Sequence, residues 1–117
     1  MKKEEFTLPE GITEAMIAGA MEQHKIGRDK MRLLEIPLSD DPADGSKAVL
    51  VKVPERTVIG QFQRFIDTDP KKAQEILVKA CLLSHKDEVL ADDGLFYGAL
   101  TGISELIPVR KAVVKNL

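Results

Sequence analysis

The sequence predicts an α+β fold: an amino-terminal helix, a short antiparallel β-hairpin and a helical carboxy-terminal half of three to four helices. Two short segments alternate apolar and polar residues on either side of a turn-rich stretch, which is typical of a hairpin. Beyond residue 54, apolar residues recur at helical spacing in consecutive segments. With 117 residues, of which 44% are hydrophobic, the chain has the length and composition of a single domain over residues 1–117.

The amino-terminal part of that domain, residues 9–53, is predicted to form a helix followed by the hairpin. An apolar stripe that includes Met16 and Met21 indicates a helix over residues 9–25. Gly27 is placed to end this helix in a left-handed conformation. Because the stripe consists of small and flexible residues, we expect the helix to pack loosely and to adapt to a partner.

The hairpin is predicted from residues 31–38 and 47–53, whose apolar side chains alternate. Residues 39–46 between them are rich in turn formers and should be an exposed connection. An isolated hairpin is only marginally stable in water, so its apolar face needs a cover. That face is formed by Val49, Val51 and Val53.

Residues 55–107 are predicted to form a helical bundle. Apolar spacing indicates helices over residues 58–66, 70–83 and 95–107. The first of these carries Phe62, which we expect to be buried where this helix and the hairpin meet the 95–107 helix. The last of them is the most apolar.

Aspartates mark where two of these helices begin. Asp69 followed by Pro70 is typical of a cap and first helical position, and Asp92 with Asp93 precedes the last helix in the same way. This capping explanation is preferred over a catalytic carboxylate pair. Three glycines in the last helix are spaced four residues apart and would permit close approach of another helix: Gly94, Gly98 and Gly102.

Composition and charge argue against several classes of function. The net charge is −2, and Lys and Arg are scattered, so we expect no nucleic-acid partner. The lone Cys81 excludes an intramolecular disulfide, and residues 1–6 lack the apolar run of a signal peptide. No apolar run approaches the ~20 residues that span a bilayer. We therefore expect a cytoplasmic protein with no membrane partner.

The side chains that could carry chemistry form no recognisable site. The acidic turn at residues 40–45 fails as a calcium loop, because Pro42 and Val51 stand where oxygen ligands are required. His24 and His85 are far apart in the sequence and have no ligand neighbours at metal-binding spacing. Cys81 lies on an apolar stripe and is interpreted as a buried structural residue. We predict no enzyme, and assign no catalytic, cofactor-binding or metal-binding residue.

The order of elements resembles that of the small tail assembly chaperones of tailed bacteriophages. The resemblance covers residues 12–107 and is carried by three stretches: the strand at residues 49–53 leading into Pro54-Glu55-Arg56-Thr57, the helix at residues 73–83, and the helix start at residues 92–96. It implies a non-enzymatic protein of a phage or prophage. Such a protein binds the tape measure protein in the host cytoplasm, recruits tail tube protein and is absent from the mature virion.

The residues expected to contact partners lie at the two ends of the chain. Methionine suits adaptable apolar contacts, although both methionines could equally fill the core. The basic amphipathic tail, residues 109–117, either docks on the core as a short helix or connects to an extension that frameshifting adds in the chaperone family. The candidates are Met16, Met21, Val109, Val113 and Leu117.

Two other functions stay open on the sequence alone. The chain could be a small structural adaptor whose hairpin edge extends the sheet of a neighbouring subunit. It could also be a regulatory protein of phage or bacterial origin that binds one host protein through its acidic turn and helices. A homo-oligomer is compatible with each of these functions.

Overall fold

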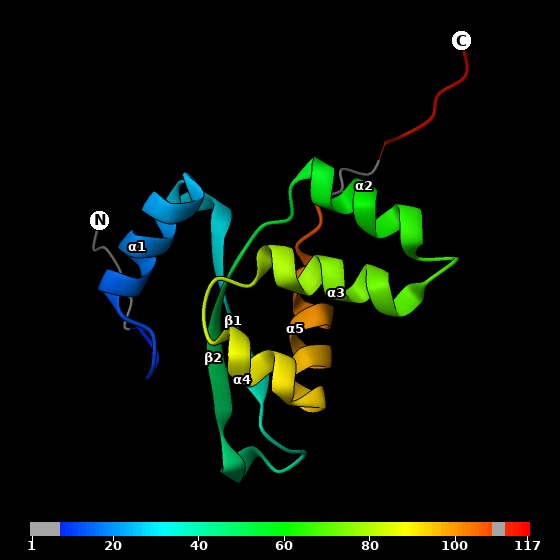
Figure 1. Cartoon of the computed structure of the whole chain (residues 1–117). Coiled ribbons are helices and arrows are strands. Elements are labelled where there is room, and N and C mark those ends of the chain that lie inside the picture. Colours follow the sequence, from blue (N-terminus) through cyan, green and yellow to red (C-terminus); the bar gives the residue numbers. More distant parts are fainter. Residues whose placement is uncertain (1–7, 109–111) are drawn as a thin grey trace.

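The computed structural model describes residues 8–108 and 112–117 and confirms the predicted α+β class. A helix, a hairpin and a helical carboxy-terminal half follow one another (Figure 1). The elements in chain order are α1 (Glu14–His24), η1 (Arg28–Lys30), β1 (Met31–Pro37), η2 (Pro42–Asp44), β2 (Ser46–Lys52), α2 (Arg56–Phe65), α3 (Pro70–Cys81), α4 (Lys86–Ala91) and α5 (Asp93–Glu105).

The hairpin matches its prediction to within one residue. β1 and β2 pair antiparallel, from Met31 opposite Lys52 to Pro37 opposite Ser46. The turn between them is exposed and is organised by Asp41, whose side chain accepts a hydrogen bond from the backbone N–H of Ala43 at 2.9 Å. The aspartates of this turn therefore act as turn formers.

Helices cover both faces of this two-stranded sheet (Figure 1). α3, α4 and α5 lie on one side and α1 lies on the other. We call the buried residues on the first side the main cluster: Ile36, Val49, Val51, Leu77, Val78, Cys81, Leu82, Val89, Ala99 and Ile103. Those on the second side form the α1 cluster: Ile12, Ile17, Ala20, Met31, Ala48 and Leu50.

The cover over the valine face is as predicted, whereas burial of the opposite face was not expected. Val49 and Val51 are fully buried, and Leu50 between them is only 2% exposed. The uninterrupted apolar run of residues 48–51 is the sequence signal for this, because a strand buried on both faces does not alternate.

Two glycines of α5 let this helix lie directly against β1. A Cβ placed on Gly98 would collide with the side chain of Ile36, and one on Gly102 would lie 2.8 Å from a methyl group of Leu34. The prediction of close packing is therefore right for these two positions, but the neighbour is a strand rather than a helix. Asp92 caps α5 as predicted, since its side chain accepts from the N–H of Leu95 at 3.0 Å.

α2 is more peripheral than expected. It packs mainly on α3 and has no fully buried residue. Phe62 contacts the main cluster but is only partly buried. The centre of that cluster is instead supplied by α3, where Leu77 is completely buried.

The predicted start of the first helix was wrong by five residues. α1 begins at Glu14 because Thr13 caps it, with Oγ1 accepting from the N–H of Met16 at 3.1 Å. Its end is also set differently, since Lys25 takes the left-handed conformation with φ 54° and Gly27 has φ −81°.

α4 was not predicted, because the sequence pattern indicated no helix between residues 83 and 95. The helix has six residues and starts after His85, which has φ 55°. Asp87 and Glu88 in its first turn are favourably placed toward the positive end of the helix dipole. So short a helix carries too few apolar residues to show a periodic pattern, and Val89 is its only buried residue.

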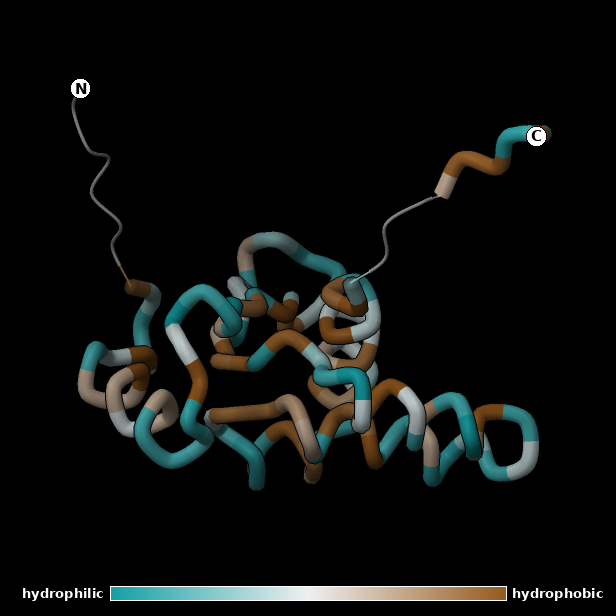
Figure 2. Tube along the Cα trace, turned by 90° about the horizontal axis from the view of Figure 1, so that it is seen from above, coloured by the Kyte–Doolittle hydropathy of each residue, from teal (hydrophilic) through white to brown (hydrophobic). Residues whose placement is uncertain are grey.

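Residues 112–117 of the carboxy-terminal tail do not form the docked short helix that was one of the two alternatives predicted for it. These residues have no helix or strand and extend away from the rest of the chain (Figure 2). Val113 is 80% exposed and Leu117 is fully exposed. Val109 lies outside the described residues. Among those described, no helix has the length and hydropathy required to cross a membrane.

Candidate functional site

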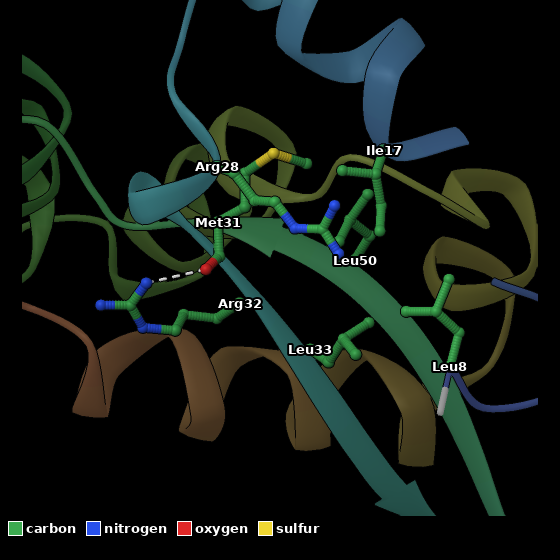
Figure 3. Close-up of a pocket in the computed structure, with 7 residues that line it drawn as sticks. All are labelled: Leu8, Ile17, Arg28, Met31, Arg32, Leu33 and Leu50. Atoms are coloured by element: carbon green, nitrogen blue, oxygen red, sulfur yellow. Dashed lines mark hydrogen bonds between the residues drawn. The ribbon is translucent and has the colours of Figure 1, made fainter. Parts of the chain in front are cut away.

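An apolar groove opens between α1 and the hairpin (Figure 3). It has a volume of about 500 Å³ and is mostly lined by apolar atoms. Its residues come from the segment before α1, from α1, from η1 and from both strands: Leu8, Ile17, Arg28, Met31, Arg32, Leu33 and Leu50. We call it the α1 groove.

The groove exists because α1 covers its face of the sheet only in part. The buried residues of α1 are Ile17 and Ala20. A small side chain such as alanine fills less of the space between a helix and a sheet than a large apolar side chain does. The part of the sheet face around Leu33 therefore stays open.

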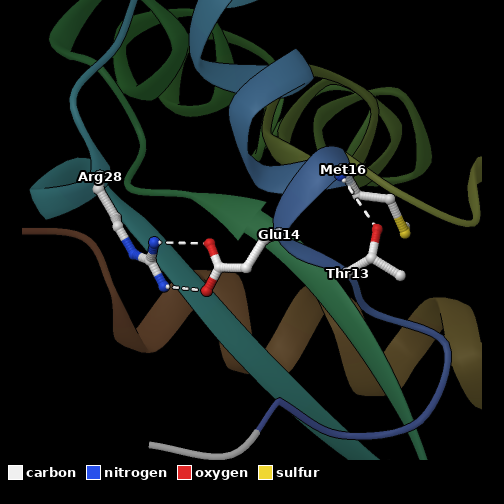
Figure 4. Close-up of polar contacts among 4 residues, drawn as sticks. All are labelled: Thr13, Glu14, Met16 and Arg28. Atoms are coloured by element: carbon white, nitrogen blue, oxygen red, sulfur yellow. Dashed lines mark hydrogen bonds and ion pairs between the residues drawn. The ribbon is translucent and has the colours of Figure 1, made fainter.

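An exposed ion pair holds one end of α1 against the start of β1 (Figure 4). Arg28 in η1 donates two hydrogen bonds to the carboxylate of Glu14, at 2.9 and 3.1 Å. The hydrogen bond from Arg28 keeps the pKa of Glu14 below its ordinary value, and Glu14 raises the pKa of Arg28. The pair joins two segments that are separated by the whole of α1.

Arg32 is the second cation of the groove, and it lies on the other side of β1. Its side chain extends away from Ile17 and Leu8 (Figure 3). It donates hydrogen bonds to the backbone oxygens of Asp29 and Met31, each at 2.7 Å. Within the described residues it forms no ion pair, so its charge faces solvent.

The predicted partner-binding residues are not brought together. Met16 and Met21 are partly buried and pack against the α1 cluster. Val113 and Leu117 are exposed in the tail. The methionines thus support the wall of the α1 groove, and neither of them lines it.

A second, smaller opening lies where α3 meets α4 and α5. It measures about 320 Å³ and has a mixed polar and apolar lining that includes Lys71, Glu75 and Phe96. Leu90 and Tyr97 beside it are 40% and 54% exposed. Its polar share is larger than that of the α1 groove, so the α1 groove is the better candidate for an apolar ligand.

Cys81 and the two histidines lie outside the α1 groove. Burial raises the pKa of the Cys81 thiol to about 11, so the thiolate nucleophile is scarce at neutral pH. Burial also lowers the pKa of His24, with Lys52 and Lys86 adding to the effect. His85 contacts Ser84 at 2.8 Å. Among residues 8–108 and 112–117, no three His, Cys, Asp or Glu side chains come close enough to hold a metal.

The residues of the groove were not identified from the sequence. Leu33 and Leu50 belong to the strand face for which no role was predicted, and Arg28 lies in a short 3-10 helix that has no periodic signal. The one available clue was the apolar character of both faces of residues 48–51, which requires a cover on the second face as well.

Comparison with known proteins shows the fold alone. No family model matches the chain, and a search of the curated proteins finds no match. Among solved structures, the chain is similar to the uncharacterised protein rbstp2171 from Bacillus stearothermophilus, with a TM-score of 0.56 and 14% identity. The similarity covers 84% of this chain and 99% of that one. Identity this low supports a shared arrangement of elements and no shared activity.

Proposed function

We propose that the chain is a non-enzymatic tail assembly chaperone of a phage or prophage. It binds the tape measure protein in the host cytoplasm, recruits tail tube protein and leaves before the virion is complete. Two observations support the proposal: the order of elements resembles that of the chaperone family, and the chain has an open apolar groove. The groove is the observation that carries it, because holding an aggregation-prone protein requires accessible apolar surface.

The wall of the α1 groove has the properties of an adaptable surface. α1 contributes Ile17 directly, while Met16 and Met21 pack against the α1 cluster without lining the groove. Methionine is unbranched and polarizable, so this layer can repack around different apolar side chains. Leu33 and Leu50 on the rigid hairpin form the opposite wall. A long client with many similar apolar segments suits such a site.

Co-expression tests the proposal. The tape measure protein of the same phage or prophage is produced with and without this chain, and its soluble fraction is measured. We expect the chain to keep it soluble. Leu33→Arg, which puts a charge into the groove, should abolish the effect, whereas Leu38→Arg should not, since Leu38 is 55% exposed beyond the end of β1. Thermal unfolding verifies that both variants fold.

Two results contradict the proposal. A tape measure protein that stays insoluble with the wild-type chain shows that there is no chaperone activity. Equal activity of the folded Leu33 and Leu38 variants shows that the groove is not the binding surface.

A further inference from the structure

The outer edges of the two strands differ in their hydrogen bonding. The backbone N–H of Leu50 in β2 donates to Ser84 Oγ at 2.8 Å, and its carbonyl accepts from the N–H of Leu83 at 2.8 Å. Both groups thus point away from the hairpin, toward the segment that follows α3. Directly opposite Leu50 is Leu33 of β1.

This pattern determines which backbone groups of β1 point outward. In an antiparallel pair, opposite residues are either both bonded across the pair or both directed outward, and the two kinds alternate. Since Leu50 is directed outward, so are Leu33 and, two residues further along, Glu35. Arg32, Leu34 and Ile36 make the bonds within the hairpin.

The outward groups at the start of β1 already have partners. The N–H of Met31 donates to the carbonyl of Arg28, and the Met31 carbonyl accepts from Arg32 at 2.7 Å. The backbone groups of Leu33 and Glu35 form no hydrogen bond outside the hairpin with any described residue. Pro37 ends the strand and has no N–H to offer. The open part of the edge is therefore short and centred on two residues.

This open edge adjoins the α1 groove. The side chain of Leu33 points from β1 into the groove (Figure 3). A strand added beside β1 would place every second side chain on the same face as Leu33, over apolar lining. Arg32, whose charge faces solvent, lies at one end of the open edge, so a carboxylate is favoured there.

We propose that an extended segment of the tape measure protein adds to β1 as a third strand. Its backbone pairs with Leu33 and Glu35, its alternate apolar side chains enter the α1 groove, and an acidic residue lies near Arg32. This inference rests on the proposed function. It specifies an extended client, because a helix has already used its own N–H and C=O groups and would leave those of β1 unpaired.

The experiment uses short overlapping peptides that cover the tape measure protein. Each is titrated with the full chain by fluorescence anisotropy, and NMR amide exchange is recorded with and without the tightest binder. We expect the amides of Leu33 and Glu35 to exchange much more slowly in the complex. The amide of Leu34, bonded within the hairpin, is the internal reference.

A pair of proline variants separates backbone pairing from other effects. Glu35→Pro removes an outward N–H from the open edge and no bond of the hairpin, and should weaken peptide binding by about tenfold. Ser46→Pro removes the equivalent outward N–H at the other edge, at the first residue of β2, and should leave affinity unchanged. Thermal unfolding checks that both variants fold.

The outcomes distinguish this inference from the proposed function. A peptide that binds without slowing the exchange of Leu33 and Glu35, or that binds folded Glu35→Pro as tightly as wild type, overturns the inference alone. Failure of every peptide to bind also overturns the inference alone if co-expression still keeps the tape measure protein soluble, and overturns both if it does not. A concentration-dependent dimer in which these amides are protected without peptide assigns the edge to a second copy of the chain and also overturns the inference.

Discussion

The two faces of the same small sheet are closed to very different extents. On the side of the main cluster, Val49, Val51 and Leu77 are completely buried. On the side of α1, the helix residues that close the core, Ile17 and Ala20, are 5% and 7% exposed, and the α1 groove opens beside them. We infer from this difference that the main cluster supplies stability, whereas the α1 side supplies a surface that can change.

The largest expected effects come from deleting one large side chain on each face. Leu77→Ala should reduce the free energy of unfolding by about 3–5 kcal/mol, because the rigid main cluster cannot collapse around the cavity. Ile17→Ala should cost about 2 kcal/mol, at the low end for such a change, because α1 can shift into the space. Urea denaturation measures both. Equal losses would contradict the distinction between the faces.

Ser84→Ala is expected to have the next largest effect. Ser84 is buried, and its Oγ accepts the outward N–H of Leu50. Without it that N–H loses its partner inside the protein, at a cost of about 1–3 kcal/mol. The matched control is Ser104→Ala in α5, since Ser104 Oγ only donates to the carbonyl of Leu100 within the same helix. If the two variants unfold at the same urea concentration, the hydrogen bond that covers the β2 edge contributes little to the free energy of unfolding.

A pair of glycine substitutions tests how tightly α5 is pressed onto β1. Gly98→Ala should destabilise by about 1–2 kcal/mol, because the new Cβ collides with the branched side chain of Ile36. Gly60→Ala in α2 should stabilise by roughly 0.5–1 kcal/mol, since a Cβ there has open space and alanine favours the helix. The melting temperature of each variant relative to wild type shows whether that substitution stabilises or destabilises the chain. A stable Gly98→Ala variant would mean that the main cluster can adjust.

The sequence was sufficient for features that depend on local patterns. The strands, the caps at Asp69 and Asp92 and the order of elements follow from alternation and from side-chain hydrogen bonding over three residues. The α1 boundary failed for a reason that is also local. Thr13 caps the helix, whereas the prediction started it at Pro9 because an apolar pattern begins at Ile12.

The candidate site could not be predicted in the same way. The α1 groove joins Leu8, Arg28 and Leu50, which are far apart in the sequence, and its depth depends on how α1 crosses the sheet. Likewise, the open edge of β1 depends on the register of the hairpin and on a tertiary contact, because Leu83 and Ser84 cover the outer edge of β2 and leave that of β1 uncovered. The adaptable character of α1 stays a prediction from composition, and composition did not indicate what that helix covers.

The smallest expected effect concerns the ion pair at the end of α1. Since the pKa of Glu14 is lowered in the folded chain, the Arg28 pair contributes to stability above the ordinary pKa of glutamate. That contribution is lost as the pH falls through the lower pKa of the folded state. Both side chains are exposed, so the effect on global unfolding should be slight. Amide exchange within α1 is the sensitive measurement.

In the wild-type chain, α1 amides should exchange faster, relative to the intrinsic rate, once Glu14 is protonated. Arg28→Gln should remove this pH dependence and leave α1 as weakly protected at neutral pH as wild type is in acid. Lys47→Gln is the control. Lys47 lowers the pKa of Glu88 just as Arg28 lowers that of Glu14, but this pair joins β2 to α4 on the opposite face of the sheet. If Lys47→Gln alters α1 exchange as much as Arg28→Gln does, the two faces of the sheet are coupled. The α1 side of the sheet then does not change independently of the main cluster.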